Sequence, residues 1–345
     1  MMLTTNNHPE TWLEPRPEGL YCQPADAYID AMRPHSRVIV THGHADHARG
    51  GHGQVWATPE TLAIMAVRYG DDHAVITSAL EYGQRINIGV IEPVFLTFYP
   101  AGHILGSAQV LLEYRDARVV ITGDYKRTPD PSCMSFTAIP CDVFITEATF
   151  ALPVFKHPTL SSQIDRLLTS LDRFPERCHL IGVYALGKCQ RVLLGLRAAG
   201  YQAPIYVHGA MIKLIELYRK YGFDFGQIIP VTEVADKHAL RGQIVLAPPS
   251  ALHDRWSRRL PDVLTVGASG WMQVRARAKQ KNVELPLVIS DHCDWQELLD
   301  SIQEVNPREV WVTHGREDAL IHACEQLGYT ARALRLIGYD EDSES

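Results

Sequence analysis

The stretch VIVTHGHADHARGGHG, residues 38–53, runs from a short apolar segment directly into four potential metal ligands. His42, His44, Asp46 and His47 lie within six positions, in a loop that we predict to follow a strand over residues 37–41. In such a loop the first two ligands can point to one side while the last two reach another, so one stretch can serve two metal ions. Imidazole with carboxylate suits zinc, and also manganese or iron. Because no cysteine stands among the ligands, the motif favours an open site for water and substrate over a closed structural zinc site.

Several other apolar, β-branched runs that we predict to be strands also lead into an ionisable residue. They are RVVITG before Asp124, DVFIT before Glu147, LPLVISD before His292, EVWVT before His314 and, after a short turn, VFLTFYPAG before His103. Ligand sites of layered α/β proteins lie where the carboxyl ends of strands meet loops, so strands lying side by side would bring these residues together. Each residue taken alone could be a turn or capping residue, but their shared placement favours a common site.

Stretches with helical apolar spacing separate the predicted strands. They cover residues 59–70, 160–174, 187–200, 210–222 and 295–307, with Gly or Pro near their ends. Thr58, Pro59 and Glu60 predict the start of the first helix, as an N-cap, a proline in the first turn and an acid beside it. The last helix lies between the strands that end near His292 and His314, which predicts a β-α-β order.

The composition is that of an ordinary globular protein with room for two domains: 345 residues, 46% hydrophobic and 21% charged. No apolar run approaches the roughly 20 residues of a membrane span, and the first residues show no secretory signal. Seven scattered cysteines without a CxxC pair indicate reduced thiols and a cytoplasmic location. The formal net charge of −7 argues weakly against a nucleic-acid partner, although bound metals or clustered basic residues would supply local positive charge.

Taken in order, the run THGHADH … AGHILGSAQV … TGDY resembles the motifs of metallo-β-lactamase-fold hydrolases. Glu147 in TEATF, His292 in SDHCDW and His314 in VTHGRE resemble the motifs added in the β-CASP nuclease branch of that superfamily. The segments YIDAMRP, HADHARGGHG and SGWMQVRARAKQ are similar in sequence to bacterial ligase-associated DNA exonucleases, which are relatives of the Artemis-type repair nucleases. The resemblance covers nearly the whole chain.

The resemblance implies a fold. It predicts an α/β protein with a four-layer αββα metallo-β-lactamase sandwich, formed by residues 1–150 and 286–345, and an inserted α/β β-CASP domain, formed by residues 151–285. The inserted block alternates strand and helix signals of its own. The resemblance also implies two divalent metal ions, with zinc favoured and manganese or iron as alternatives.

The resemblance also assigns roles to the candidate residues. One metal would be held by His42, His44 and His103 and the other by Asp46, His47 and His314, with Asp124 as the bridge and Asp46 counted among the catalytic residues as well. His292 would protonate the leaving oxygen, oriented by Glu147, because a carboxylate partner fixes the tautomer of a histidine and raises its pKa. Asp30, in AYIDAMRP, would orient a ligand histidine, and its alternative is a helix cap before Pro34.

Basic and aromatic residues of the inserted block are candidate nucleic-acid contacts: Lys188, Ser269, Gly270, Trp271, Arg275 and Arg277. Lys188 stands at one predicted helix start and Ser269 near another, and helix N-termini bind phosphate through free N–H groups. Trp271 could stack on a base, and the basic run from Arg275 to residue 281 would neutralise phosphates. The alternatives are a solvated lysine, a buried tryptophan and a solvated run of charge.

These features lead us to expect a metal-dependent DNA exonuclease of DNA repair, hydrolysing phosphodiester bonds from 5′ to 3′ on single-stranded or end-resected DNA. The alternative within the fold is an RNA-processing β-CASP ribonuclease. His314 supports that alternative, because a histidine in the last motif is typical of the RNA enzymes of the group, whereas the eukaryotic DNA-directed members usually have valine. A small-molecule hydrolase and a scaffold with an inactive site are the other classes considered. The family resemblance also implies an association with a DNA ligase and a helicase, and no membrane partner is expected.

Overall fold

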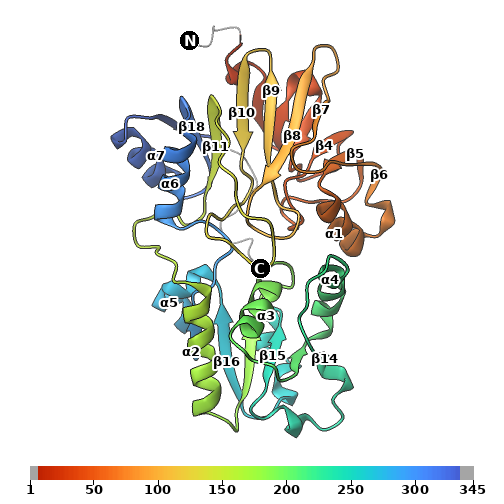
Figure 1. Ribbon diagram of the computed structural model, residues 1–345, viewed down its shortest axis with the longest axis vertical. Helices are drawn as coiled ribbons and strands as arrows, with labels where there is room; N and C mark the ends of the chain where they lie inside the picture. Colours follow the sequence, from red (N-terminus) through yellow and green to blue (C-terminus); the bar gives the residue numbers. More distant parts are fainter. Residues whose placement is uncertain (1–6, 335–345) are drawn as a thin grey trace. The chain divides into compact units, whose positions relative to one another are not determined.

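The computed structural model describes residues 7–334, which divide into two compact units (Figure 1). The first unit runs to Lys156 and resumes at His292, and the second is His157–Asp291. Both boundaries lie a few residues beyond those expected from the sequence, at 151 and 285. At the second boundary the reason is a contact within the second unit, because the Val288 N–H donates to Gln163 Oε1 at 2.9 Å.

The first unit contains two sheets. One sheet has the order β1 (Leu13–Arg16), β2 (Gly19–Cys22), β3 (Ala27–Ile29), β4 (Arg37–Ile39), β5 (His52–Ala57) and β6 (Ala74–Ala79). The other has the order β19 (Thr330–Ala333), β18 (Glu309–Gly315), β11 (Val143–Ala148), β10 (Ala117–Ile121), β9 (Ala108–Tyr114), β8 (Val94–Pro100) and β7 (Arg85–Asn87). In the second sheet β10, β11, β18 and β19 run parallel, so their carboxyl ends share one edge.

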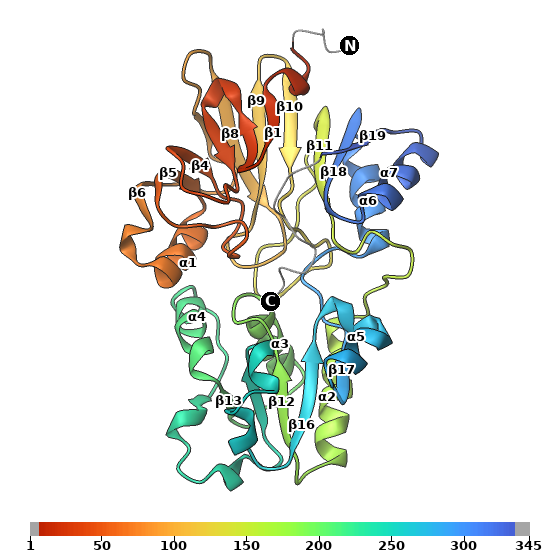
Figure 2. The ribbon, with the colours of Figure 1, turned by 180° about the vertical axis from the view of Figure 1, so that it is seen from behind.

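The two sheets pack face to face because alternate residues of their strands point to opposite sides. In β4 Ile39 belongs to a core shared by the two sheets, whereas Val38 packs on the outer face with α1 (Pro59–Tyr69). In β10 Ile121 faces the shared core, and Val120 packs on the outer face with apolar residues of α6 (Trp295–Val305) and α7 (Glu317–Gln326). Figure 2 shows the same layers from behind, and the predicted four-layer αββα sandwich is confirmed.

Helix α1 begins where the sequence predicts. The Thr58 side chain accepts the Thr61 N–H at 3.2 Å, Pro59 occupies the first turn, and the helix ends at Gly70 with a positive φ of 87°. Helix α6 begins with a capping box, in which Asp294 and Glu297 each accept the other's backbone N–H. This second cap lies directly after His292, so it fixes the chain next to a candidate site residue.

One expectation about the strands is wrong. The run before His292 forms β17 (Leu285–Leu287), which pairs with β16 (Val263–Ala268) in the sheet of the second unit. It therefore does not lie beside β18, and the predicted β-α-β order joins two different sheets. Apolar periodicity predicts that a segment is a strand, but it does not specify which neighbour its N–H and C=O groups will pair with.

The second unit is an α/β domain built on a parallel sheet. Its strand order is β14 (Ile228–Pro230), β13 (Ile205–Val207), β15 (Ile244–Ala247), β12 (Cys178–Gly182), β16 and β17, and its helices are α2 (Leu160–Arg173), α3 (Lys188–Ala198), α4 (Gly209–Lys220) and α5 (Arg275–Gln280). Helix α2 packs on β17 and α4 on β15. One face of the sheet, which includes Leu180 and Val245, is covered by short 3-10 segments that contribute Leu240 and Leu252.

Among the described residues 7–334, no helix is both long and apolar enough to cross a membrane. All seven cysteines lie in this part of the chain and all are free thiols, as the absence of a CxxC pair led us to expect.

Candidate metal centre

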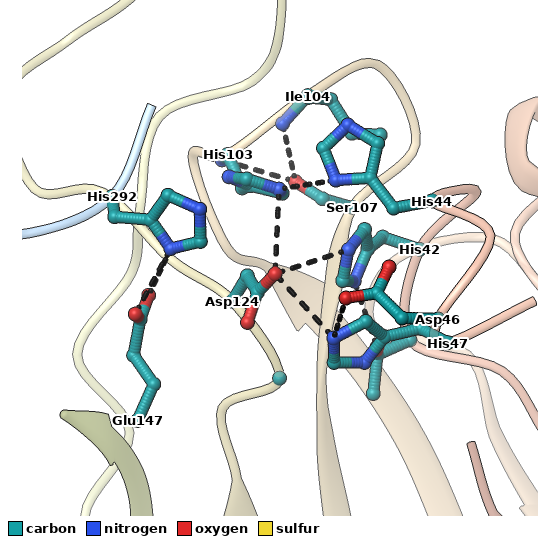
Figure 3. A network of polar contacts seen from close by, with 12 residues as sticks. His42, His44, Asp46, His47, His103, Ile104, Ser107, Asp124, Glu147 and His292 are labelled. Carbon is teal, nitrogen blue, oxygen red and sulfur yellow. Dashed lines mark hydrogen bonds and ion pairs between the residues drawn. The ribbon is translucent and has the colours of Figure 1, made fainter. Parts of the chain in front are cut away.

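The candidate ligands come from loops at the ends of several strands of the first unit (Figure 3). The loop after β4 carries His42, His44, Asp46 and His47, the turn between β8 and β9 carries His103, the loop after β10 carries Asp124, and β18 ends with His314. Residues more than 270 positions apart in the sequence are thus brought to one edge of the sandwich. Glu147, near the end of β11, lies on the same edge.

Four of these residues form a compact set. The ligand atoms of His42, His44, His103 and Asp124 all lie within 4.8 Å of one another. His103 Nε2 is 3.0 Å from His44 Nδ1 and 3.7 Å from Asp124 Oδ2. Two nitrogens bound at ~2.0–2.1 Å to one tetrahedral zinc lie about 3.3 Å apart, so these separations suit donors that share a single ion.

The hydrogen bonds behind His42 fix which of its nitrogens faces the site. Thr41 Oγ1 lies 2.7 Å from Asp30 Oδ2 and 3.0 Å from His42 Nδ1. An ionised carboxylate only accepts, so the hydroxyl donates to Asp30 and must accept from the His42 Nδ1–H. The lone pair of His42 is then on Nε2, which is buried, makes no hydrogen bond and lies 3.3 Å from Asp124 Oδ2. Two facing lone pairs at this distance are an arrangement that a cation between them would stabilise.

Asp30 acts on a second ligand in the same way. Its Oδ2 also accepts from the His47 Nδ1–H at 2.8 Å, and its Oδ1 accepts the Thr41 N–H at 2.8 Å. His47 therefore turns Nε2 toward Asp124 Oδ2, at 3.4 Å. Asp30 lies between β3 and β4, where no helix begins, so the alternative of a helix cap does not apply, and its orienting role stays a prediction to which these contacts belong. They add Thr41, which the sequence reading missed because its hydroxyl acts only through the folded contact with Asp30.

We expect Thr41→Val to lower metal affinity about 10–100-fold, because the nearly isosteric valine removes the acceptor that holds the His42 tautomer. The measurement is the metal-to-protein ratio after dialysis against graded concentrations of chelator. Thr41→Ser keeps the hydroxyl and is expected to bind metal as the parent does. Equal metal retention by the valine variant would show that the hydroxyl does not orient His42.

Asp46, His47 and His314 surround a second, looser position. His47 Nε2 is 3.8 Å from Asp46 Oδ2, and the His47 and His314 rings lie 5.7 Å apart between centroids. Among the described residues these three do not form a set with all ligand atoms within 4.8 Å. With Asp124 Oδ2 close to His42, His47 and His103 alike, this carboxylate is the group that could bridge the two positions.

The charges of the site favour a cation. Burial disfavours the charged form of His47, but the charges of Asp124, Asp46 and Asp30 outweigh it and raise the pKa of His47 to about 10. Burial and the charge of His47 lower the pKa of His314 to about 4, so that His314 is neutral and keeps a lone pair. Burial would raise the pKa of Asp124, yet the neighbouring histidine charges hold it well below its usual value. Burial likewise lowers the pKa of His42, so His42 and His314 are neutral donors, whereas His47 would have to release its proton to bind zinc, manganese or iron.

His292 and Glu147 form a pair next to the metal ligands, with one ligand atom of each within 4.8 Å of Asp124. The His292 Nδ1–H donates to Glu147 Oε2 at 2.9 Å, and the His292 ring is 4.8 Å from that of His103 between centroids. Glu147 also accepts the Tyr125 N–H at 2.9 Å and the Thr149 hydroxyl at 2.5 Å. Three donors hold the Glu147 carboxylate in place and it fixes the ring that it contacts, so His292 is oriented with Nε2 away from Glu147.

Two glycines permit the close packing of these loops. Gly102, with φ of 75°, lies where a Cβ would come within 2.2 Å of the Lys126 carbonyl oxygen. Gly123, with φ of 56°, lies where a Cβ would come within 2.7 Å of Thr41 Oγ1. The backbones next to His103 and Asp124 therefore approach their neighbours more closely than any other residue would allow.

The candidate nucleic-acid contacts of the second unit differ in their positions. Lys188 is only 1% exposed, and its ammonium lies 3.2 Å from Asp291 Oδ1. A buried and paired ammonium does not face solvent, so the predicted contact of Lys188 with a nucleic-acid backbone does not fit its position. The sequence reading assumed a free side chain at the helix start and could not foresee this partner.

The segment around Trp271 is less regular than predicted. Ser269 accepts the Trp271 N–H at 3.3 Å and begins a 3-10 turn, Gly270–Gln273, while α5 is a separate helix of six residues. The Arg277 guanidinium stacks on the Trp271 ring, 3.9 Å from its centroid, and Arg275 is exposed. Ser269 thus caps a short 3-10 turn that Gly270 begins, and the basic run lies on a separate helix; phosphate contacts of Ser269, Gly270 and Arg275 stay predictions.

No family model matches the chain. A protein named "Probable DNA ligase" from Opitutus terrae is 29% identical over 327 residues, which cover 92% of this chain and 30% of that protein. Cleavage and polyadenylation specificity factor subunit 3 of Dictyostelium discoideum is 26% identical, over 81% of this chain and 46% of that protein. An RNase J-like protein of Methanocaldococcus jannaschii is 28% identical, over 53% of this chain and 50% of that protein. The chain thus spans half or less of the length of these relatives.

Among solved structures, a protein of unknown function from Enterococcus faecalis V583 superposes with a TM-score of 0.55 at 14% identity, over 87% of this chain and 79% of that one. This similarity concerns the fold alone. Together with the αββα sandwich and the histidine–aspartate cluster, the sequence similarities are consistent with a metallo-β-lactamase-fold nuclease of the β-CASP type, which the chain resembles.

Proposed function

We propose that the protein is a metal-dependent phosphodiesterase that degrades DNA from an end, in the 5′ to 3′ direction, during DNA repair. The observation that supports the proposal is that two groups of residues lie next to each other in the first unit. One is the compact donor set of His42, His44, His103 and Asp124, and the other is the His292–Glu147 pair beside it. A metal-binding set next to a histidine oriented by a carboxylate suits hydrolysis of an ester whose leaving group needs a proton.

In this proposal two divalent ions, zinc or alternatively manganese or iron, would be held by the seven ligands predicted from the sequence. When bound, they would supply a nucleophilic hydroxide and offset the charge of the phosphate. The residues of the chain do the rest. Asp124 offsets the charge between the two positions, and Asp30 with Thr41 holds two ligand histidines in the tautomer that binds metal.

His292 is the proposed general acid. Its Nδ1–H is engaged by Glu147, so the proton available to a leaving oxygen is the one on Nε2. After that proton has been given, the ring keeps its Nδ1–H and the same orientation, and water can restore the proton on Nε2. Glu147 itself is held in place by the Tyr125 N–H and the Thr149 hydroxyl, which both donate to it.

The choice of DNA rests on the wider similarity to a protein named as a probable DNA ligase, which extends over 92% of this chain. We propose on the same ground that the enzyme works with a DNA ligase, and the family resemblance adds a helicase. The alternative is an RNA-processing ribonuclease, favoured by His314 at the end of β18 and by the name of the RNase J-like relative. The free thiols suit work in the cytoplasm.

The test is a competition between matched single strands of DNA and RNA, both with a 5′-phosphate, incubated with the purified protein and Mn²⁺ or Zn²⁺. We expect the DNA to disappear faster, and a 5′-terminal label to be released as a mononucleotide before a 3′-terminal label. Faster loss of the RNA would overturn the choice of DNA. Release of the 3′-label first would overturn the polarity but not the chemistry.

Arg275 gives a test of the nucleic-acid surface. If its guanidinium contacts a phosphate, Arg275→Ala is expected to weaken DNA binding and to reduce the slope of log K against log salt by about 0.7 for a single strand. The measurement is binding of a labelled strand at several salt concentrations. Lys220→Ala, at the end of α4, is the control and should leave the slope unchanged. An unchanged slope in the arginine variant would leave Arg275 a solvated charge.

A further inference from the structure

Lys126 is a basic residue buried close to the candidate site, and no role has yet been assigned to it. It lies two positions after Asp124, in the loop that follows β10, and it is 6% exposed. Its ammonium donates to the His292 carbonyl oxygen at 3.1 Å and to Glu297 Oε2 at 2.6 Å. A buried ammonium is stable only when paired, so these contacts must persist in the folded protein.

Glu297, the partner of Lys126, accepts several further hydrogen bonds. Besides Lys126, its carboxylate accepts the Thr128 N–H at 2.7 Å, the Thr128 hydroxyl at 2.5 Å and the Asp294 N–H at 3.0 Å. The donors come from two segments, the loop after Asp124 and the first turn of α6. Burial alone would raise the pKa of Glu297, but the charge of Lys126 and these hydrogen bonds lower it to about 2, so the carboxylate stays ionised.

The backbone of His292 is held on both sides by the same loop. Its carbonyl oxygen accepts from Lys126, and the N–H of the next residue, Cys293, donates to the Tyr125 carbonyl oxygen at 2.9 Å. Tyr125 in turn gives its own N–H to Glu147. The loop that presents Asp124 therefore also fixes the backbone of His292 and the carboxylate that orients its ring.

We propose that Lys126, together with Glu297, is a positioning residue that sets the place of the His292 imidazole relative to Asp124. This inference rests on the proposed function, since it assigns a purpose to the position of the general acid. Lys126 does not touch the reacting atoms. Lys126 keeps His292, the proton donor, at a fixed position relative to Asp124, the carboxylate between the two metal positions. It can do so because the segments that carry His292 and Asp124 are joined by the Lys126–Glu297 contact.

The position of an acid matters most when the leaving group needs its proton. We expect Lys126→Met to lower kcat for DNA by up to about 100-fold, the loss that a displacement of roughly 1 Å can cause. KM and the metal-to-protein ratio are expected to stay within about twofold of the parent, because no metal ligand is altered. Hydrolysis of bis(4-nitrophenyl) phosphate is expected to change by less than about threefold, since nitrophenolate departs without a proton.

Three variants control this experiment. Lys126→Arg can still donate to both oxygens and should recover most of kcat. Arg37→Met removes another basic residue that donates to backbone carbonyls of the first unit, those of Ala25 and Ile88, and should leave both substrates unaffected. If Lys126→Met alone does not fold because Glu297 loses its partner, the double variant with Glu297→Gln removes both charges and is expected to show the same selective loss on DNA.

A second measurement does not depend on turnover. The Nδ1 proton of His292, hydrogen-bonded to Glu147, should give a low-field proton resonance that shifts or broadens in Lys126→Met and not in Arg37→Met. Equal losses on DNA and on the nitrophenyl ester, loss of metal, or an unchanged resonance with unchanged kcat would each overturn the positioning role. A parent protein that cleaves the nitrophenyl ester but no nucleic acid would overturn the proposed function, while the resonance would still test the position of His292.

Discussion

Replacing His292 with alanine is expected to lower kcat for DNA by about 10²–10⁴-fold, the range that a positioned general acid supplies. His292 is not part of the compact donor set of His42, His44, His103 and Asp124, and its Nδ1 is engaged by Glu147. The metal content is therefore expected to stay unchanged. The measurements are single-turnover rates on a 5′-phosphorylated strand and the metal-to-protein ratio of the same preparation.

The matched variant is Glu147→Gln. It keeps the shape of the side chain but offers the imidazole a neutral partner, so the protonated form of His292 loses stabilisation and its pKa is expected to fall. A general acid works only while it is protonated. As the pH is raised, the activity of the Glu147→Gln variant should therefore begin to fall at a lower pH than that of the parent. If the His292→Ala protein instead loses its metals, His292 belongs to the ligands and the role of general acid is wrong.

The second large effect is expected for Asp124→Asn. Asp124 Oδ2 faces Nε2 of three histidines, at 3.3 Å from His42, 3.4 Å from His47 and 3.7 Å from His103. The amide carries no charge to offset two cations, so we expect both metals to bind weakly and activity to fall by at least about 10³-fold, the scale on which single electrostatic stabilisers act. Metal analysis of protein purified without chelator checks the first part, and the turnover of DNA checks the second.

A carboxylate elsewhere in the same unit provides the control. Asp142 accepts the Arg118 N–H at 2.9 Å and is none of the predicted ligands, so Asp142→Asn should keep both metals and full activity. If Asp124→Asn bound two metals as tightly as the parent does, the carboxylate would not be the bridge. One metal retained would mean that Asp124 serves a single position.

The layers of the first unit were predicted from the resemblance to metallo-β-lactamase-fold hydrolases, whereas individual elements were predicted from local patterns. Apolar, β-branched runs such as residues 37–41 predicted strands, and the Thr58–Pro59 start predicted a helix. The candidate ligands could also be predicted, because an ionisable residue that directly follows an apolar run can be recognised in the sequence itself. The pairing of β17 with β16 was not visible, because it depends on which of two sheets offers a free edge.

The residues that the sequence did not reveal act through partners far away in the chain. Lys126 meets Glu297 171 positions later, and Thr41 matters only because Asp30 fixes the direction of its hydroxyl. The prediction for Lys188 was wrong for the same reason. A lysine after a glycine turn is usually exposed to solvent, and the sequence does not show that Asp291 pairs with it. Hydrogen bonds between distant residues have no periodic signature, so only the fold displays them.

The parallel pairing of β11 with β18 has a consequence for biosynthesis. Val143 lies opposite Glu309, so the strand that carries Glu147 leaves the ribosome well before its neighbour has been translated. At about 5–20 residues per second the edge of β11 that will pair with β18 waits for about 10–30 s with its N–H and C=O groups unpaired, while the whole of His157–Asp291 emerges. The nascent chain must therefore shield an open strand edge during elongation, and early folding of the interrupting domain would shorten the search that follows.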